Sequence, residues 1–355
     1  MSANAAEVEA LCARVAQAHA RTEPLRIAGG DTKSFYGRLA EGEKLSTAAL
    51  CGVIDYQSTE LVITALAGSR LGDIEHTIAE RGQMLAFEPP HFGEAATLGG
   101  ALACGFSGPR RPYAGSARDF MLGVRCVDGR GKLLRFGGQV MKNVAGYDIS
   151  RLMVGALGTL GVILEASLKV LPAPEAEQTL RFDMPVTTAL ESMNRWAGKP
   201  LPLSAAAYYA DTLWLRLSGS AAAVEAAHAQ LGGAPVADSG PFWRALREHT
   251  LEFFDNDRPL WRLSVPPAAG HMTIAGEWLI DWGGAQRWLK TNVSAQSIRA
   301  STQAVGGHAT LFRGGDRSGE VFTPLDAVQL RIHRGLKARM DPKGIFNPGR
   351  MYPEF

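Results

Sequence analysis

Residues 89–119 read PPHFGEAATLGGALACGFSGPRRPYAGSARD. Glycine recurs in this stretch at irregular intervals, which fits neither the period of a strand nor that of a helix. Glycines spaced in this way let a backbone approach a ligand closely and turn successive N–H groups toward an anion. Thr97 and Ser107 add hydroxyl donors, and arginines follow between residues 110 and 118. The stretch therefore predicts a site for a phosphate-bearing ligand; the alternative is a long glycine-rich surface loop without one.

A second glycine turn lies earlier, in LRIAGGDTKSFYG at residues 25–37. Its first letters are typical of a short strand, which ends at Gly29-Gly30. The DTKS that follows offers N–H groups, hydroxyls and one ammonium group within a few residues. This makes the turn a second candidate anion site. Many strand–turn junctions look the same, and Lys33 is open to two interpretations, a phosphate contact or a solvated loop lysine.

The composition is that of an ordinary globular protein, with 46% hydrophobic and 20% charged residues. The length of 355 residues is enough for two domains or for one domain with an insertion. Lys and Arg number 37 and Asp and Glu 35, so the net charge of +2 gives no footprint for nucleic acid. Apolar runs are shorter than a membrane span, and the acidic N-terminus does not resemble a secretory signal. We expect a cytoplasmic protein without a transmembrane segment.

The four cysteines lie at positions 12, 51, 104 and 126. They form no Cys-x-x-Cys pair and no spacing typical of a metal site. We therefore expect reduced, mostly buried thiols and no metal ligands among them. A chain with this cysteine pattern cannot hold an iron–sulfur cluster by itself.

The periodicity of the apolar residues predicts several elements. Val8, Leu11 and Val15 share one face of a helix over residues 5–20. A helix over 70–81 would be capped by Ser69 and end at Gly82. Further predictions, in chain order, are a hairpin around 128–131, a short helix followed by a strand over 149–171, a hairpin around Asp211, and a last helix near 324–339.

Pro172 and Pro174 mark a change of composition, at which we place a domain boundary. The chain from about 175 to 300 has the pattern of a smaller α/β unit. Asn347-Pro348-Gly349 forms a turn after the last helix.

Five stretches taken together resemble the FAD-binding domain of the vanillyl-alcohol oxidase and p-cresol methylhydroxylase (PCMH) class. Each is weak alone, but their common order is specific, and they span nearly the whole chain. They are IAGGDTKSFYG (27–37), ATLGGALACGFSG (96–108), RDFMLG (118–123), NVAGYDISRLMVGALGTLGVILEASL (143–168) and DPKGIFNPGR (341–350). Within the class, the SGPRR at 107–111, the NVAGYDISRLMVGALGTLG at 143–161 and the short length resemble the FAD-binding subunits of bacterial glycolate oxidases.

The resemblance implies an α+β fold with three parts. A PCMH-type, two-part FAD-binding domain would span residues 1–173. A smaller α/β cap domain of the substrate-binding type would follow at 174–306. The C-terminal segment, 307–355, would return to the flavin site.

The resemblance also implies where FAD lies. Its pyrophosphate would lie between the 28–34 turn and the 96–108 stretch, its adenine and flavin edges near 158–162, and Asn347 close to the flavin ring. Two facing sets of N–H groups would neutralise a pyrophosphate without several cations. The implied FAD-binding residues are Ala28, Gly29, Gly30, Asp31, Thr32, Lys33, Pro90, Thr97, Leu98, Gly99, Gly100, Gly105, Ser107, Gly108, Arg118, Asp119, Gly158, Gly161, Val162 and Asn347.

Two alternatives for this cofactor site are set aside. Dinucleotide binding of the Rossmann type needs a G-x-G-x-x-G that follows a first strand and opens a helix, and the sequence has none. Covalent flavin attachment in the resembled class uses a histidine in the first glycine turn or a cysteine in the second. The first turn has no histidine, and Cys104 in the second is interpreted as small buried filler. We expect non-covalent FAD.

Oxidation of a 2-hydroxy acid needs a base for the hydroxyl proton and a cation for the carboxylate. Members of the class that oxidise D-2-hydroxy acids carry a histidine-rich metal motif and a Gly-Glu-His-Gly segment. Here the first region offers only His308, and the second reads Gly-Glu-Val-Phe with Val321 in place of histidine. We therefore assign no catalytic residue and no metal. The nominal candidates are His308, Arg313, His333 and Arg334.

Three hypotheses follow. In the first, the chain is a flavin subunit of a glycolate (D-2-hydroxy acid) oxidase or dehydrogenase complex that relays electrons, next to a larger catalytic flavoprotein subunit and an iron–sulfur subunit at the inner face of the cytoplasmic membrane. In the second, it is a self-sufficient FAD-dependent 2-hydroxy acid oxidoreductase. In the third, it is a structural partner with a vestigial flavin site. The intact glycine turns argue against the third and Val321 against the second, so we favour the first.

Overall fold

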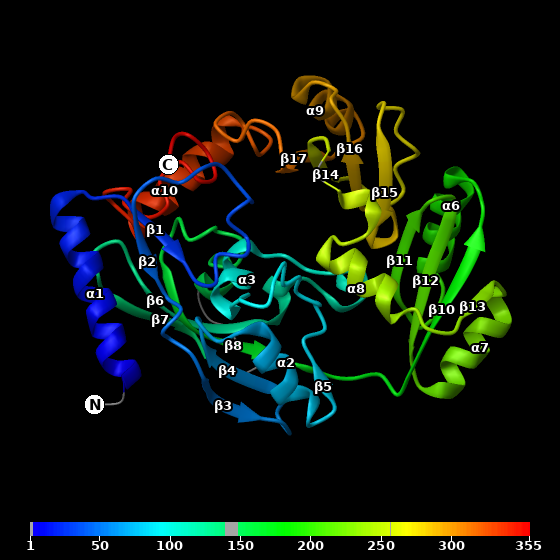
Figure 1. The fold of residues 1–355 in the computed structure, drawn as a ribbon, viewed down its shortest axis with the longest axis horizontal. Coiled ribbons are helices and arrows are strands. Elements are labelled where there is room, and N and C mark those ends of the chain that lie inside the picture. Colours follow the sequence, from blue (N-terminus) through cyan, green and yellow to red (C-terminus); the bar gives the residue numbers. More distant parts are fainter. Residues whose placement is uncertain (1–2, 139–147, 256) are drawn as a thin grey trace.

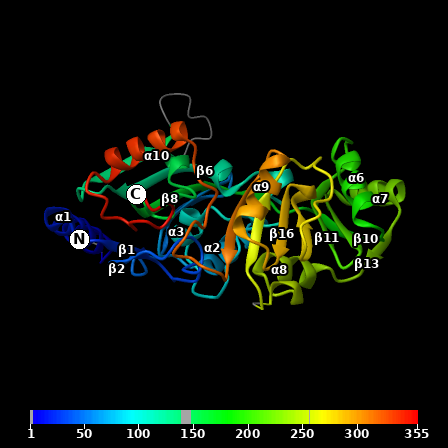
Figure 2. The same ribbon diagram turned by 90° about the horizontal axis from the view of Figure 1, so that it is seen from above.

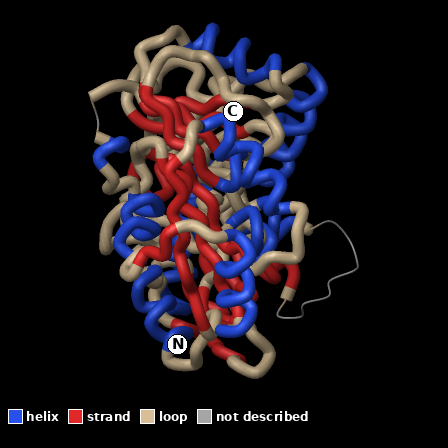
Figure 3. Tube along the Cα trace, turned by 90° about the vertical axis from the view of Figure 1, so that its right-hand side faces the viewer, coloured by secondary structure: helices blue, strands red, loops and turns tan. Residues whose placement is uncertain are grey.

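The computed structural model describes residues 3–138, 148–255 and 257–355. Helices pack on two large antiparallel sheets that lie side by side, so the fold is of the expected α+β class (Figure 1). Seen from the side, the strands run through the middle of the molecule with helices on either side (Figure 3). The stretch 143–147 of the predicted fourth motif lies outside the described residues.

The first half of the chain builds a five-stranded sheet. In order of pairing, its strands are β3 (Val53–Gln57), β4 (Val62–Leu66), β8 (Val162–Lys169), β6 (Met121–Val127) and β7 (Leu133–Gly137). β6 and β7 form the predicted hairpin around residues 128–131. The central strand β8 is buried along almost its whole length, because both faces of the sheet are covered.

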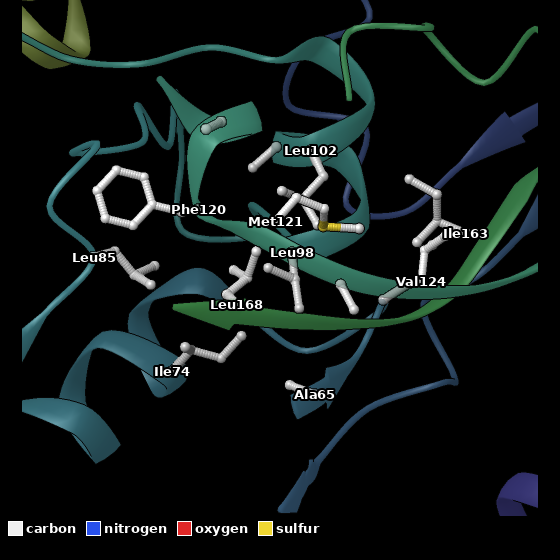
Figure 4. Packing of buried hydrophobic residues seen from close by; sticks show 14 of the residues in the cluster. Ala65, Ile74, Leu85, Leu98, Leu102, Phe120, Met121, Val124, Ile163 and Leu168 are labelled. Carbon is white, nitrogen blue, oxygen red and sulfur yellow. The ribbon is translucent and has the colours of Figure 1, made fainter. Parts of the chain in front are cut away.

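One face of this sheet is covered by α2 (Leu71–Ala79) and α3 (Leu98–Cys104). Ile74 of α2 and Leu102 of α3 point into the same apolar cluster as Leu168 of β8 (Figure 4). Burying side chains of this size contributes about 1.5–3 kcal/mol each. This packing fixes the position of α3, whose first turn borders the pocket described below.

The other face is covered by the N-terminal helix and by a two-stranded parallel sheet. These elements are α1 (Ala3–Arg21), β1 (Leu25–Ala28) and β2 (Glu43–Ser46). Val8, Leu11 and Val15 are buried against this face, which confirms the predicted helix and its apolar side. Ile345 and Phe346, near the C-terminus, join the same cluster.

The helix predicted over residues 70–81 is α2, but the predicted cap is wrong. Arg70 occupies the N-cap position without a side-chain cap bond. The Ser69 Oγ accepts a hydrogen bond from the Gly52 N–H at 2.9 Å and donates one to the Gly52 carbonyl at 3.2 Å. Ser69 therefore ties the end of β4 to the loop before β3.

The second half of the chain builds an eight-stranded sheet. In order of pairing, its strands are β13 (Ala234–Val236), β10 (Ala176–Asp183), β12 (Thr212–Gly219), β11 (Leu203–Tyr209), β15 (Glu277–Asp281), β16 (Gln286–Lys290), β14 (Leu260–Ser264) and β17 (His308–Arg313). β11 and β12 are the predicted hairpin around Asp211. β17 pairs with β14, so the sheet extends past residue 306, where we expected the cap to end.

The remaining elements are short or lie outside the two large sheets. They are α4 (Arg111–Ala114), α5 (Ile149–Leu152), α6 (Val186–Ala197), α7 (Ala221–Leu231), α8 (Gly240–Glu248), α9 (Ala295–Ala304), α10 (Ala327–Met340), β5 (Gln83–Met84) and β9 (Leu171–Pro172). None of the helices in the described ranges combines the length and the hydropathy that a bilayer crossing requires.

After β17 the chain returns to the first half of the molecule. α10 lies over the five-stranded sheet (Figure 2). The segment that follows it is hydrogen-bonded to β1, because the Leu25 N–H donates to the Ile345 carbonyl at 2.7 Å and the Asn347 N–H to the Leu25 carbonyl at 2.9 Å. The C-terminal motif thereby lies beside the first glycine turn.

Candidate functional site

A pocket that is partly open to solvent lies where four segments of the chain meet. These segments are the 27–34 turn, the start of α3, residues 157–163 and residues 347–350. The predicted cofactor residues that line it are Ala28, Gly29, Gly30, Asp31, Thr32, Lys33, Thr97, Gly99, Gly100, Gly158, Gly161 and Asn347. The structure thus brings together residues that are more than 300 positions apart in the sequence.

The 28–34 turn presents free backbone donors to this pocket. Asp31 adopts a positive φ of 58°, which reverses the chain after the glycine pair. The Ser34 N–H donates to the Asp31 carbonyl at 3.3 Å. The N–H groups of residues 30–33 have no acceptor among the residues that the structure describes. Neighbouring amides without protein partners are a typical cradle for an anion.

The two glycines of this turn also have a packing role. A Cβ at Gly29 would collide with the side chain of Thr97, and a Cβ at Gly30 with the carbonyl of Ala95. Only glycine lets the 28–34 turn approach the stretch before α3 this closely. The glycine pair therefore holds the two turns together, in addition to exposing the amides.

The start of α3 does not form the second set of free N–H groups that we expected. The Leu98 and Gly99 N–H groups donate to carbonyls of the 67–69 turn at 2.9 and 2.7 Å. The Gly100 N–H donates to the Thr97 Oγ1 at 3.3 Å, which makes Thr97 the N-cap. These amides are satisfied because the turn after β4 packs directly on the helix start. The expectation of two facing amide cradles is wrong at these positions.

At the pocket, the Asn347 side chain forms a hydrogen-bonded clip between two backbone segments. Its Oδ1 accepts from the Ile27 N–H at 2.9 Å, and its Nδ2 donates to the Leu157 carbonyl at 2.6 Å. Gly158 has a positive φ of 73°, and a Cβ there would lie 2.6 Å from the Asn347 Nδ2. The Asn347 side chain is therefore engaged by the protein on both sides while it lines the pocket.

Other predicted residues lie outside the lining, and four of them have structural roles. Leu98 and Val162 are buried in the two apolar clusters of the five-stranded sheet. The Ser107 Oγ accepts from the Ala117 N–H, and the Asp119 carboxylate accepts from the backbone and hydroxyl of Ser116. The predicted residues that do not line the pocket are Pro90, Leu98, Gly105, Ser107, Gly108, Arg118, Asp119 and Val162.

Sequence reasoning missed part of the lining. Arg350 belongs to the DPKGIFNPGR motif, and nothing in the sequence connects its cation with the first turn. Cys104 was considered only as filler; it borders the pocket, and burial raises the pKa of its thiol. The lining residues that were not predicted are Ile27, Ser34, Thr47, Ala103, Cys104, Leu157, Ile163 and Arg350.

The space between the first glycine turn and the eight-stranded sheet is filled by aromatic rings. The Tyr36 ring lies 4.6 Å from that of Phe106 and 5.3 Å from that of Phe312, and Phe312 lies 4.8 Å from Trp288. All four side chains are buried. The Arg262 Nη2 donates to the Tyr36 Oη at 2.9 Å, which satisfies the buried hydroxyl.

The described pocket lining carries one carboxylate, that of Asp31, which pairs with the Arg26 Nη1 at 3.1 Å. The titratable groups of this lining are Asp31, Lys33, Cys104 and Arg350, and the described lining contains no histidine and no glutamate. Val321 is 1% exposed and packs in an apolar cluster. The nominal candidates His308, Arg313, His333 and Arg334 lie outside the lining. Within the described ranges, no group of three or more His, Cys, Asp or Glu side chains is placed to hold a metal ion.

Comparison with known proteins identifies a domain family and several relatives of this chain. The family model of an FAD binding domain matches residues 2–137. The glycolate oxidase subunit GlcE of Escherichia coli (strain K12) is 50% identical over 346 residues, which are 98% of this chain and 97% of that protein. The glycolate oxidase subunit GlcD of Bacillus subtilis (strain 168) is 33% identical over 128 residues, which are 36% of this chain and 27% of that protein.

Among solved structures, alkyldihydroxyacetonephosphate synthase superposes with a TM-score of 0.64 and 16% identity. The match covers 95% of this chain and 75% of that one. At this identity the likeness concerns the fold alone.

Proposed function

The chain belongs to the family of the glycolate oxidase subunit GlcE, and its residues 2–137 match an FAD binding domain. We propose that it is the FAD-carrying, electron-relaying subunit of a complex that oxidises glycolate or related 2-hydroxy acids. The observation that carries this proposal is the pocket at the 28–34 turn. It combines free amides, two buried cations and apolar walls in one cavity. Such a combination suits a ligand with a pyrophosphate and flat aromatic parts.

The residues present fit FAD. The N–H groups of residues 30–33 would hold phosphate oxygens, and Thr97 offers a hydroxyl at the same cavity. Ile27, Leu157 and Ile163 supply apolar surface for the rings. When bound, FAD supplies a two-electron acceptor that also exchanges single electrons. The protein's own task is then to bind it, orient it and exclude water from it.

Non-covalent attachment is part of the proposal. Among the described lining residues, Cys104 is the thiol and no imidazole is present. Burial raises the pKa of Cys104, so the thiol stays protonated near neutral pH and is a poor nucleophile. The nearby cations Arg350 and Lys33 act in the opposite direction but are the smaller causes.

Two features support electron relay by this chain rather than oxidation of a hydroxy acid within it. The described pocket lining offers no histidine or glutamate as a base for a hydroxyl proton, and its carboxylate, that of Asp31, is held by Arg26. The rings of Tyr36, Phe106 and Phe312 occupy the space toward the eight-stranded sheet. A self-sufficient oxidoreductase would need both a base and room for the substrate. A purely structural role does not account for the free amides and the buried cations.

The proposal includes partners and a cellular place. A larger flavoprotein subunit would bind the hydroxy acid, and an iron–sulfur subunit would take electrons onward, with the complex at the cytoplasmic side of the membrane. We also propose the domain limits 1–173 and 174–306, with the cap sheet completed by β17 of the C-terminal segment.

An anaerobic visible spectrum tests the function. The purified chain should be yellow, with an absorption band at about 450 nm as in oxidised flavins. It should stay yellow after addition of glycolate. Acid precipitation should release the flavin into the supernatant. Addition of the larger flavoprotein subunit should make glycolate bleach the spectrum of this chain. Bleaching by glycolate without a partner contradicts the relay, and a chain that takes up no FAD contradicts the proposed cofactor.

A further inference from the structure

Lys33 is a buried cation at the pocket. Its side chain leaves the first glycine turn, and the residue is 5% exposed. The Nζ donates to the His91 carbonyl at 2.9 Å and to the Thr32 Oγ1 at 3.3 Å. Both acceptors are neutral, and burial lowers the pKa of the ammonium group. Lys33 forms no ion pair with any residue that the structure describes.

Arg350 is a second buried cation at the same pocket, contributed by the opposite end of the chain. It is 8% exposed. Its Nη2 donates to the Tyr36 carbonyl at 3.2 Å and to the Lys33 carbonyl at 3.5 Å. The Nε and Nη1 have no acceptor among the described residues, although a guanidinium carries five N–H donors. Burial lowers the pKa of Arg350 as well.

The carboxylates near these cations are engaged elsewhere. The Asp31 carboxylate pairs with the Arg26 Nη1 at 3.1 Å. The Glu248 carboxylate accepts from the backbone of His91 and Phe92 and from the Arg247 Nε. The pocket therefore holds two positive charges that no described carboxylate neutralises in direct contact. Buried charges without partners cost several kcal/mol each, so such a site is stable when an anion enters it.

We propose that Lys33 and Arg350 form a two-cation clamp for the dianionic pyrophosphate of a dinucleotide, with the free N–H groups of residues 30–33 as the third side. This inference rests on the proposed function, since it assigns the pyrophosphate of FAD to these cations. The pyrophosphate of FAD carries two negative charges at neutral pH, which the two cations balance. These cations take the place of the N–H groups at the start of α3 as the second side of the phosphate site, because those N–H groups are hydrogen-bonded within the protein.

The clamp also assigns a role to the C-terminal motif. Arg350 follows Asn347, whose side chain fixes this segment to β1 and to the 157–158 turn. The Arg350 N–H donates to the Asn347 carbonyl at 3.1 Å. The clip and the cation therefore lie in one hydrogen-bonded turn, and the last motif of the chain completes a site that the first motif begins.

Ligands that differ in their phosphates test the clamp. FAD, riboflavin and ADP should be titrated into the flavin-free chain, with dissociation constants from flavin fluorescence and calorimetry. Lys33→Gln and Arg350→Gln should each raise the dissociation constants of FAD and ADP about ten- to a hundredfold, the usual effect of one lost charge-assisted hydrogen bond. The dissociation constant of riboflavin, which has no phosphate, should change by less than about twofold. Arg350→Lys should recover most of the affinity for FAD.

Arg38→Gln is the matched control. Arg38 donates to the carbonyls of Gly349 and Gly319, so it serves the same C-terminal segment without lining the pocket. The Arg38→Gln substitution should leave the preference of the chain for FAD over riboflavin unchanged. Circular dichroism and thermal unfolding show whether each variant folds.

The outcomes separate the inference from the function on which it rests. If the unmodified chain binds FAD and the two glutamine variants bind FAD and ADP as tightly, the clamp is wrong and the proposed function stands. Equal weakening for riboflavin and FAD in a folded variant also overturns the clamp, because the cation then serves the flavin ring. If the unmodified chain binds no FAD, the proposed function itself fails.

Discussion

The Arg216 Nη2 lies 2.8 Å from the Glu88 Oε1 and joins the eight-stranded sheet to the segment that leads into the glycine stretch. Arg110 extends this contact, because its Nε lies 3.2 Å from Glu88 and its Nη2 lies 2.7 Å from Glu177 on β10. Both arginine side chains are almost fully buried. The four residues form an ion-pair network between the eight-stranded sheet and the segments before and after α3.

Glu88→Gln should destabilise the protein strongly. It removes the charge that faces both Arg110 and Arg216, and loss of one partner from a buried pair costs about 3–5 kcal/mol, here lowered by the remaining Glu177. Urea denaturation followed by tryptophan fluorescence measures the free energy of unfolding. Arg181→Gln, which breaks a pair of exposed side chains with Asp183, is the control and should have little effect. Equal effects of the two substitutions would contradict the network's role.

Asp281 should make stability fall as the pH rises from about 4 to 7. Burial raises the pKa of its carboxyl from 3.8 to about 7, so in this interval the folded protein holds a proton that the unfolded chain has released. The contribution is fully present below pH 4 and is lost by pH 7, with a slope of up to about 1.4 kcal/mol per pH unit.

Asp281→Asn should remove this slope, because the side chain of asparagine does not titrate. The hydrogen bond from the Trp282 N–H to the side-chain oxygen, 2.7 Å in the parent protein, can be retained. Denaturation midpoints at pH 5, 6 and 7 for both proteins measure the difference. The charges of Glu88 and Arg216 also influence the pKa of the Asp281 carboxyl. If stability has the same dependence on pH in both proteins, the dependence arises from that ion-pair network and not from Asp281.

Gly158→Ala should weaken FAD binding and stability. The residue has φ of 73°, which costs a Cβ-bearing residue about 1–2 kcal/mol, and the new methyl group would press on the Asn347 Nδ2. Gly155 has a similar φ of 83° but no atom within 4 Å of an added Cβ, so Gly155→Ala isolates the backbone strain. Thermal unfolding and FAD content after dialysis should both be lower for Gly158→Ala. Identical values for the two variants would show that the Asn347 clip is not disturbed.

Val321→His should not create glycolate oxidation in the isolated chain. Val321 is buried among apolar side chains such as Leu311, and its carbonyl accepts from the Leu311 N–H at 2.8 Å. An imidazole there would lose about 1–3 kcal/mol as a buried polar group without a partner. The variant should unfold at lower temperature and remain yellow with glycolate. Bleaching by glycolate would show that only this histidine was missing from a substrate site.

The sequence by itself determined the local features of the fold. The apolar spacing of Val8, Leu11 and Val15 located the first helix, and Asp128 to Gly131 located the hairpin, because these signals depend on neighbours within a few residues. The glycine turns located the first side of the pocket for the same reason. The resemblance of five ordered motifs supplied the family, which comparison with known proteins bears out.

Only the tertiary structure decided which of these groups are free to bind a ligand. The amides of Leu98 and Gly99 look as available in the sequence as those of residues 30–33, but the 67–69 turn satisfies them. Arg350 is one arginine among many in the sequence; it becomes a pocket cation because β1 receives the C-terminal segment. Whether a donor is satisfied or a charge is unpaired depends on partners that are distant in the chain, and only folding places those partners.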